Sequence, residues 1–227
     1  MITNLFSAFD PATSQNLSVN WIRTFIGLIL LPIPYWILSN RINIIIKNII
    51  ITLHTEFKLL LNINSIGLTT LFIALFIFIL INNIIGLLPY VFTRSSHIVF
   101  TLSLALPLWI RLILFGWINK TQIIFAHLIP SGTPIILIPF IVCIETIRNI
   151  IRPGALAVRL IANIIAGHLL ITLLGNRATR AGIAASVLIL IQIFLIIFET
   201  AVAIIQAYVF SVLRTLYTRE VIYENSQ

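Results

Sequence analysis

Charged residues are scarce in this sequence. They make up 9% of the 227 residues, whereas 60% of the residues are hydrophobic. Soluble domains contain about 25% charged residues, so this chain has too little charge to cover a water-soluble surface. Inside a lipid bilayer, helices satisfy their own backbone hydrogen bonds. We therefore predict an all-α, polytopic membrane protein that contacts the lipid bilayer.

Cysteines and basic runs are also missing. The single cysteine, Cys143, lies in an apolar segment and excludes an internal disulfide. The net charge is +8, but the 14 Lys and Arg residues are scattered, which argues against nucleic-acid binding. The N-terminal segment has no basic region and contains Asp10, so we expect neither a secretory signal nor an Arg-rich transit peptide.

No motif for catalysis or metal binding is present. No two histidines lie three to five residues apart, which gives no support to a histidine-box metalloenzyme or a HExxH protease. The sequence contains neither a P-loop nor a nucleophile elbow. We therefore expect no nucleotide hydrolysis, no metal and no cofactor within this chain.

The N-terminal part of the chain predicts two helices of different kinds. Residues 21–38 are long and apolar enough to form a span, which Pro32 and Pro34 should kink. Residues 41–62 form an amphipathic pattern, typical of a helix that lies in the membrane interface; a poor spanning helix is the alternative. Its apolar residues recur at helical spacing, largely away from the cations: Ile42, Ile46, Ile49, Leu53, Phe57 and Leu60.

Four further segments are expected to form two hairpins. Residues 66–88 and 98–118 each approach the ~20 residues that span a bilayer, so they predict an antiparallel pair. Residues 133–175 and 183–217 are longer; the latter would make a helix of about 52 Å against ~30 Å of hydrocarbon. We predict a steeply tilted hairpin, bent at Pro153 in its first arm. Two ordinary spans before the turn remain the alternative.

Ionisable residues inside the apolar segments are functional candidates by default. An arginine such as Arg159 costs roughly 2.5–3.5 kcal/mol at the bilayer centre. At 100° per residue, His168 lies on the opposite side of the helix from Arg159 and about 13 Å further along it. This arrangement predicts two environments separated by the helix. Three other ionisable residues lie within about 40° of the azimuth of Arg159: Glu145, Arg148 and Arg152.

Polar residues also recur along the last segment. Gln192, Glu199 and Gln206 are seven residues apart and form one seam, which should face water or a partner helix because lipid cannot solvate it. The glutamines could instead act only as interhelical hydrogen-bonding groups. His168 could be a buried structural histidine, and the arginines could form structural ion pairs with the glutamates.

Two stretches resemble a known family. The sequences "IRPGALAVRLIANIIAGHLL" (151–170) and "ETAVAIIQAYVFSVL" (199–213) are similar to the two signatures of subunit a of F-type ATP synthases, in the animal mitochondrial form. The resemblance extends through "WINKTQIIFAHLIPSGTP", "LPLW" and the opening "MITNLFSAFDP", so it covers nearly the whole chain.

The resemblance implies a proton-translocating stator subunit in the mitochondrial inner membrane, without catalytic activity of its own. It would adjoin a rotating ring of c subunits, each with one carboxylate, and other membrane and peripheral-stalk subunits. Protons would reach and leave the ring through two half-channels. By similarity, the essential arginine is Arg159 and the intake groups are His168 and Glu199; Asn163 and Gln206 lie near the arginine, and Glu145 serves matrix-side release.

Three other functions fit the sequence less well. A secondary transporter should show paired repeats with broken helices, and only one long hairpin is evident. A membrane enzyme lacks its chemical motif, and a structural anchor leaves Arg159, His168 and Glu199 without a role.

Some residues depart from the family pattern. Isoleucine occurs 49 times and methionine once. Arginines stand where the family leads us to expect small, polar or apolar residues: Arg111, Arg148, Arg214 and Arg219. We hypothesise that a mitochondrial gene has been translated with the nuclear code, so that some Ile codons mean Met and some Arg codons mean Ser. If Arg148 is genuine, it competes for Glu145.

Overall fold

The computed structural model describes residues 9–11, 19–22, 40–61, 66–88, 91–127, 129, 134–178 and 185–224. All regular structure in these ranges is helical, which confirms the all-α prediction. Most of the predicted first span, residues 21–38, lies outside the described residues.

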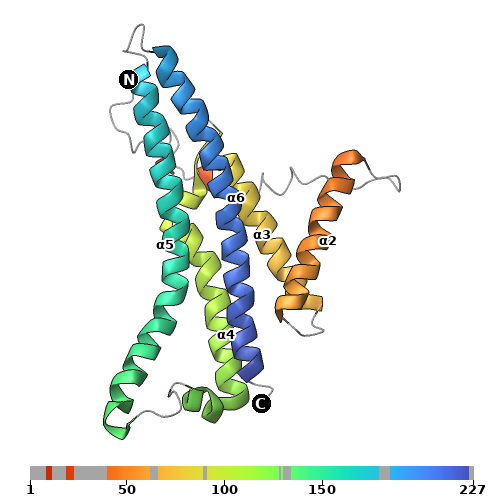
Figure 1. Ribbon diagram of the computed structural model, residues 1–227, viewed down its shortest axis with the longest axis vertical. Coiled ribbons are helices and arrows are strands. Elements are labelled where there is room, and N and C mark those ends of the chain that lie inside the picture. The colour runs from red at the N-terminus through yellow and green to blue at the C-terminus, as the bar shows by residue number, and fades with distance from the viewer. Residues whose placement is uncertain are drawn as a thin grey trace.

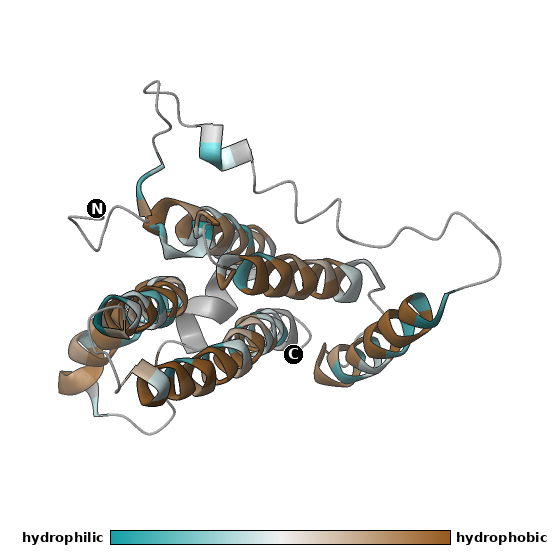
Figure 2. Cartoon of the chain, turned by 90° about the horizontal axis from the view of Figure 1, so that it is seen from above, coloured by the Kyte–Doolittle hydropathy of each residue, from teal (hydrophilic) through white to brown (hydrophobic). Residues whose placement is uncertain are grey.

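Five α-helices form the described structure (Figure 1). Their bounds are Arg41–Leu61 for α2, Ile66–Gly86 for α3, Ile98–His127 for α4, Ile138–Ala178 for α5 and Ala185–Glu224 for α6. All but α2 contain a stretch that is long and apolar enough to cross a membrane. In Figure 2, seen from above, hydrophobic colour dominates these helices and α2 stands at the edge of the bundle.

The two longest helices, α5 and α6, lie side by side (Figure 1). They contain 41 and 40 residues, which corresponds to about 60 Å each. Pro153 lies inside α5, which is one helix rather than two ordinary spans. A proline removes one backbone donor and crowds the preceding turn, so it bends a helix, and Figure 1 shows α5 bent rather than straight.

Residues from five helices share one apolar core. The small side chains of Ala105, Ala157 and Ala207 are fully buried or nearly so, which lets α4, α5 and α6 approach closely. The larger core residues fill the space around them: Phe57 and Leu61 of α2, Phe72, Phe76 and Ile79 of α3, Leu156 and Leu160 of α5, and Phe210 of α6.

Helix α2 packs on the protein through only part of its apolar stripe. Leu53 and Phe57 are buried against the core, whereas Ile42 and Ile49 are 65% and 50% exposed. The first half of the helix therefore has an apolar surface that the described residues do not cover. Contact with lipid or with another membrane subunit would bury this surface.

Candidate functional site

The polar seam of α6 faces two glycines of α5. A Cβ added to Gly167 would overlap the carboxyl carbon and both oxygens of Glu199. A Cβ added to Gly175 would lie 3.9 Å from Nε2 of Gln192. The two helices therefore run antiparallel in a fixed register, and the missing side chains of the glycines make room for polar groups from α6.

Glu199 and His168 lie at the same level of the α5–α6 pair. Glu199 is 7% exposed and its carboxyl group lies against Gly167, the residue that precedes His168. The His168 ring hydrogen-bonds to the backbone of Gly86, at the end of α3, and meets the ring of Phe9 edge-on at 6.1 Å. Two titratable side chains from different helices are thus brought to one region of the protein interior.

One nitrogen of His168 has no partner among the described residues. Its Nε2 atom is buried and makes no hydrogen bond there. A buried polar atom without a partner normally binds water. Water bound at Nε2 would give the imidazole a partner with which to exchange a proton.

Arg159 differs from Glu199 and His168 in its exposure. Its side chain is exposed on the surface of α5 and forms no ion pair with any of the described residues. Its exposed neighbours at helical spacing are small: Ala155, Ala162 and Ala166. An unpaired cation in a bilayer is costly, so a counter-charge on this face would stabilise Arg159.

Asn163 and Gln206 are half-buried. Asn163 lies about one turn after Arg159 on α5. Gln206 is seven residues from Glu199, so in the antiparallel register that pairs Glu199 with Gly167 it lies at about the level of Leu160. Gln206 is therefore at about the height of the arginine, and Asn163 is about one turn away from it.

A groove of about 400 Å³ lies beside Arg159. It runs along the first half of α5 and the last part of α6, and its polar lining consists of Arg148, Arg152, Arg159 and Tyr217. The predicted common azimuth of these three arginines corresponds to this shared groove. Glu145 is not among its lining residues.

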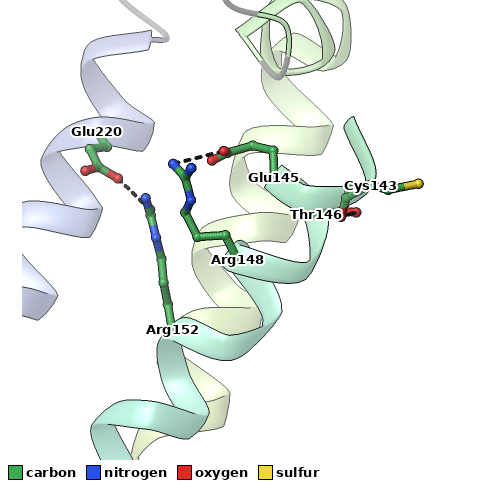
Figure 3. Close-up of polar contacts among 6 residues, drawn as sticks. All are labelled: Cys143, Glu145, Thr146, Arg148, Arg152 and Glu220. Carbon is green, nitrogen blue, oxygen red and sulfur yellow. Dashed lines mark hydrogen bonds and ion pairs between the residues drawn. The ribbon is translucent and has the colours of Figure 1, made fainter. Parts of the chain in front are cut away.

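Two ion pairs fix the cations near the groove (Figure 3). Arg152 binds Glu220 of α6 at 2.7 Å and lies over the ring of Tyr217, 5.0 Å from its centroid. Arg148 binds Glu145 at 3.0 Å within α5. The expected competition of Arg148 for Glu145 is therefore seen. Sequence reasoning missed Glu220 and Gly167, since their contacts join residues far apart in the chain.

Known proteins are similar to this chain almost from end to end. The family model described as ATP synthase A chain matches residues 17–219. ATP synthase subunit a of Anopheles gambiae is 57% identical over 225 residues, covering 97% of this chain and 100% of the relative. ATP synthase subunit a of Drosophila melanogaster is 58% identical over 223 residues, with the same coverage.

Proposed function

We propose that this chain conducts protons within an ATP synthase. The proposal proceeds from its family: the chain belongs to the ATP synthase A chain family. It is an all-helical, multi-pass protein of the mitochondrial inner membrane. Its part in ATP synthesis is proton transport rather than chemistry on the nucleotide, because its sequence has no nucleotide-binding loop.

The observation that carries the proposal is that a titratable pair and a permanent cation lie in different environments around α5. Of the titratable pair, Glu199 is buried and His168 is half-buried, whereas the permanent cation Arg159 is exposed on the surface of α5. A proton path that ends at the pair does not continue past the guanidinium, because a fixed cation repels a proton. Two aqueous half-channels can thus lie close together without joining.

The intake half-channel uses Glu199 and His168. Protons from the intermembrane space reach the half-buried imidazole and the buried carboxyl group through water, and pass from them to a carboxylate of the c-subunit ring. Gly167 keeps the carboxyl group of Glu199 against the backbone of α5, at the level of His168. Asn163 and Gln206, which lie within about one turn of the arginine, provide hydrogen bonds along the path.

Arg159 acts on the ring carboxylate. At about 4 Å and an effective dielectric constant near 20, the two charges attract by about 4 kcal/mol, which favours the ionised carboxylate and release of its proton. Arginine suits this role because its guanidinium stays charged, whereas a buried lysine loses its proton more readily. The apolar face around Arg159 and the exposed face of α6, with Ile193, Ile197 and Ile204, suit contact with the ring.

The release half-channel follows the groove beside Arg159. Its opening between α5 and α6 gives a path on the other side of the arginine from His168. Glu145 would accept the proton on the matrix side, and its ion pair with Arg148 limits that role. Other membrane and peripheral-stalk subunits would hold the chain in place against the ring.

Replacement of the arginine tests the proposal. The complex carrying Arg159→Ala, reconstituted in vesicles, should lose ATP-driven proton pumping and proton-driven ATP synthesis. Arg177→Ala, which removes an exposed cation from the last turn of the same helix, is the matched control and should pump normally. Unchanged pumping by Arg159→Ala would rule the proposal out.

A further inference from the structure

A second groove lies between α2 and α3, away from the proton path. Its volume is about 370 Å³, and both its walls come from these two helices. On α2 it is lined by Ile50, Ile51, His54 and Thr55, and on α3 by Thr70, Ile73, Ala74 and Ile77. We propose that this groove binds an anionic phospholipid, with an acyl chain along α3 and a phosphate held by His54 and Lys58.

Two lysines of α2 lie on the same side of the helix as His54, the polar residue that lines the groove together with Thr55. At 100° per residue, Lys47, His54 and Lys58 lie within about 40° of one azimuth. His54 lines the groove directly, and both lysines are exposed. The stripe therefore follows the groove, with Lys58 one turn from His54 and Lys47 extending the positive potential further along α2.

The nearby carboxylate does not cancel this charge. Glu56 lies about 160° from His54 around the helix. It accepts a hydrogen bond of 3.3 Å from the hydroxyl of Tyr208 on α6. Glu56 is thus engaged on the far side of α2, and the groove side of the helix is left net positive.

The two walls together match the chemistry of a phospholipid. Ile73, Ala74 and Ile77 of the spanning helix α3 offer an apolar surface for an acyl chain. Cations at the edge of such a groove bind lipid phosphates, and basic pockets between membrane helices recognise anionic headgroups. An apolar helix of another subunit would cover the apolar wall but leave Lys58 without a counter-charge.

Lipid exchange on the whole complex tests the phosphate contact. The ATP synthase complex would be delipidated and incubated with phosphatidylcholine vesicles containing cardiolipin, and the anionic lipid that it retains measured by mass spectrometry. Lys58→Gln should weaken retention about fivefold, the factor that one cation near an anionic surface contributes. Arg41→Gln is the matched control, because Arg41 is also exposed on α2 but lies about 120° from Lys47. Equal loss in both variants, or no loss with Lys58→Gln, would overturn the proposal.

Photolabelling tests the apolar wall without any mutation. Phosphatidylglycerol with a photoreactive group on its acyl chain should label the peptide that contains Ile73, Ala74 and Ile77 in the native complex. Excess cardiolipin should abolish this labelling, and excess phosphatidylcholine should not. Labelling confined to other helices, or displaced equally by both lipids, would show that the groove has a different occupant. Neither readout depends on proton transport, so a failed result here is distinct from failure of the proposed function.

Discussion

The two ends of the α5–α6 pair use polar residues in opposite ways. Towards the turn between the helices, Glu199 and His168 are titratable, enclosed, and form no ion pair within the described residues. Near the other end, Arg148 and Arg152 are permanent cations, and each is bound to a glutamate. One end can gain and lose protons, whereas the other holds fixed charge beside an open groove.

Under the proposed function, this difference assigns the barrier to Arg159, which lies between the two ends. A path for protons needs groups that titrate, and a barrier needs a charge that does not. Both are built on one continuous helix, so their spacing is set by the helical rise of 1.5 Å per residue. We therefore expect the largest effect on proton flux when a titratable group is removed. A smaller effect is expected when the group is displaced, and the smallest when a fixed charge is replaced.

The largest effect is expected from loss of the carboxyl group of Glu199. Glu199→Gln keeps the size of the side chain but cannot carry a proton, so proton-driven ATP synthesis should fall at least about 100-fold, the contribution of a positioned proton-transfer group. Proton flux in reconstituted vesicles measures the change. Glu220→Gln, at the fixed-charge end of the same helix, should reduce flux far less. Similar losses in both variants would refute the contrast between the two ends.

A smaller effect is expected when the carboxyl group is displaced but kept. In Gly167→Ala the new Cβ overlaps the present position of the Glu199 carboxyl group, and overpacking of this kind costs about 1–3 kcal/mol. We expect proton flux to fall roughly tenfold, in line with that energy at 1.4 kcal/mol per decade.

Gly154→Ala is the matched control for Gly167→Ala. A Cβ at Gly154 meets no atom within 4 Å, and both glycines lie within α5. The control should therefore retain full flux and assemble normally. Normal flux in Gly167→Ala would show that the position of Glu199 next to His168 does not matter for transport.

The sequence predicts the helices better than the contacts between them. Apolar length and periodicity depend on neighbouring residues, so the all-α fold and the polar seam of α6 could be read directly. Contacts across the hairpin depend on register, which no local pattern encodes. The pairing of Arg152 with Glu220 joins residues 68 positions apart, and the contact between Gly167 and Glu199 depends on how two long helices align.

Helix α2 shows the same limit. Periodicity in the sequence identifies the apolar stripe of the helix. It does not indicate which part of the stripe packs against the core of the protein. Only the half that contains Leu53 and Phe57 meets the core, and Ile42 stays exposed. The extent of packing follows from how α2 is placed against α3 and α6, which is a tertiary property.

Arg214 offers the sharpest contrast with the arginines of the groove. It is 1% exposed, donates to the carbonyl of Ala105, and lies over the ring of Phe210 at 5.9 Å. Its Nε atom is buried without a hydrogen-bond partner, and no carboxylate of the described residues pairs with it. A buried cation without a counter-charge is strongly unfavourable, whereas Arg152 has both Glu220 and Tyr217.

The smallest functional effect is expected when Arg214 is replaced by serine. Its buried neighbours Ser211, Thr215 and Thr218 each bond to a backbone carbonyl three or four residues earlier in α6, and a serine at 214 would extend that series without a charge. Arg214→Ser should therefore preserve proton flux and raise the thermal stability of the complex. Peptide mass spectrometry of the natural protein should find serine at positions 148 and 214 and arginine at 159. Arginine at 148 and 214 would refute the recoding hypothesis and leave the pair of Arg148 with Glu145 as a genuine restraint on proton release.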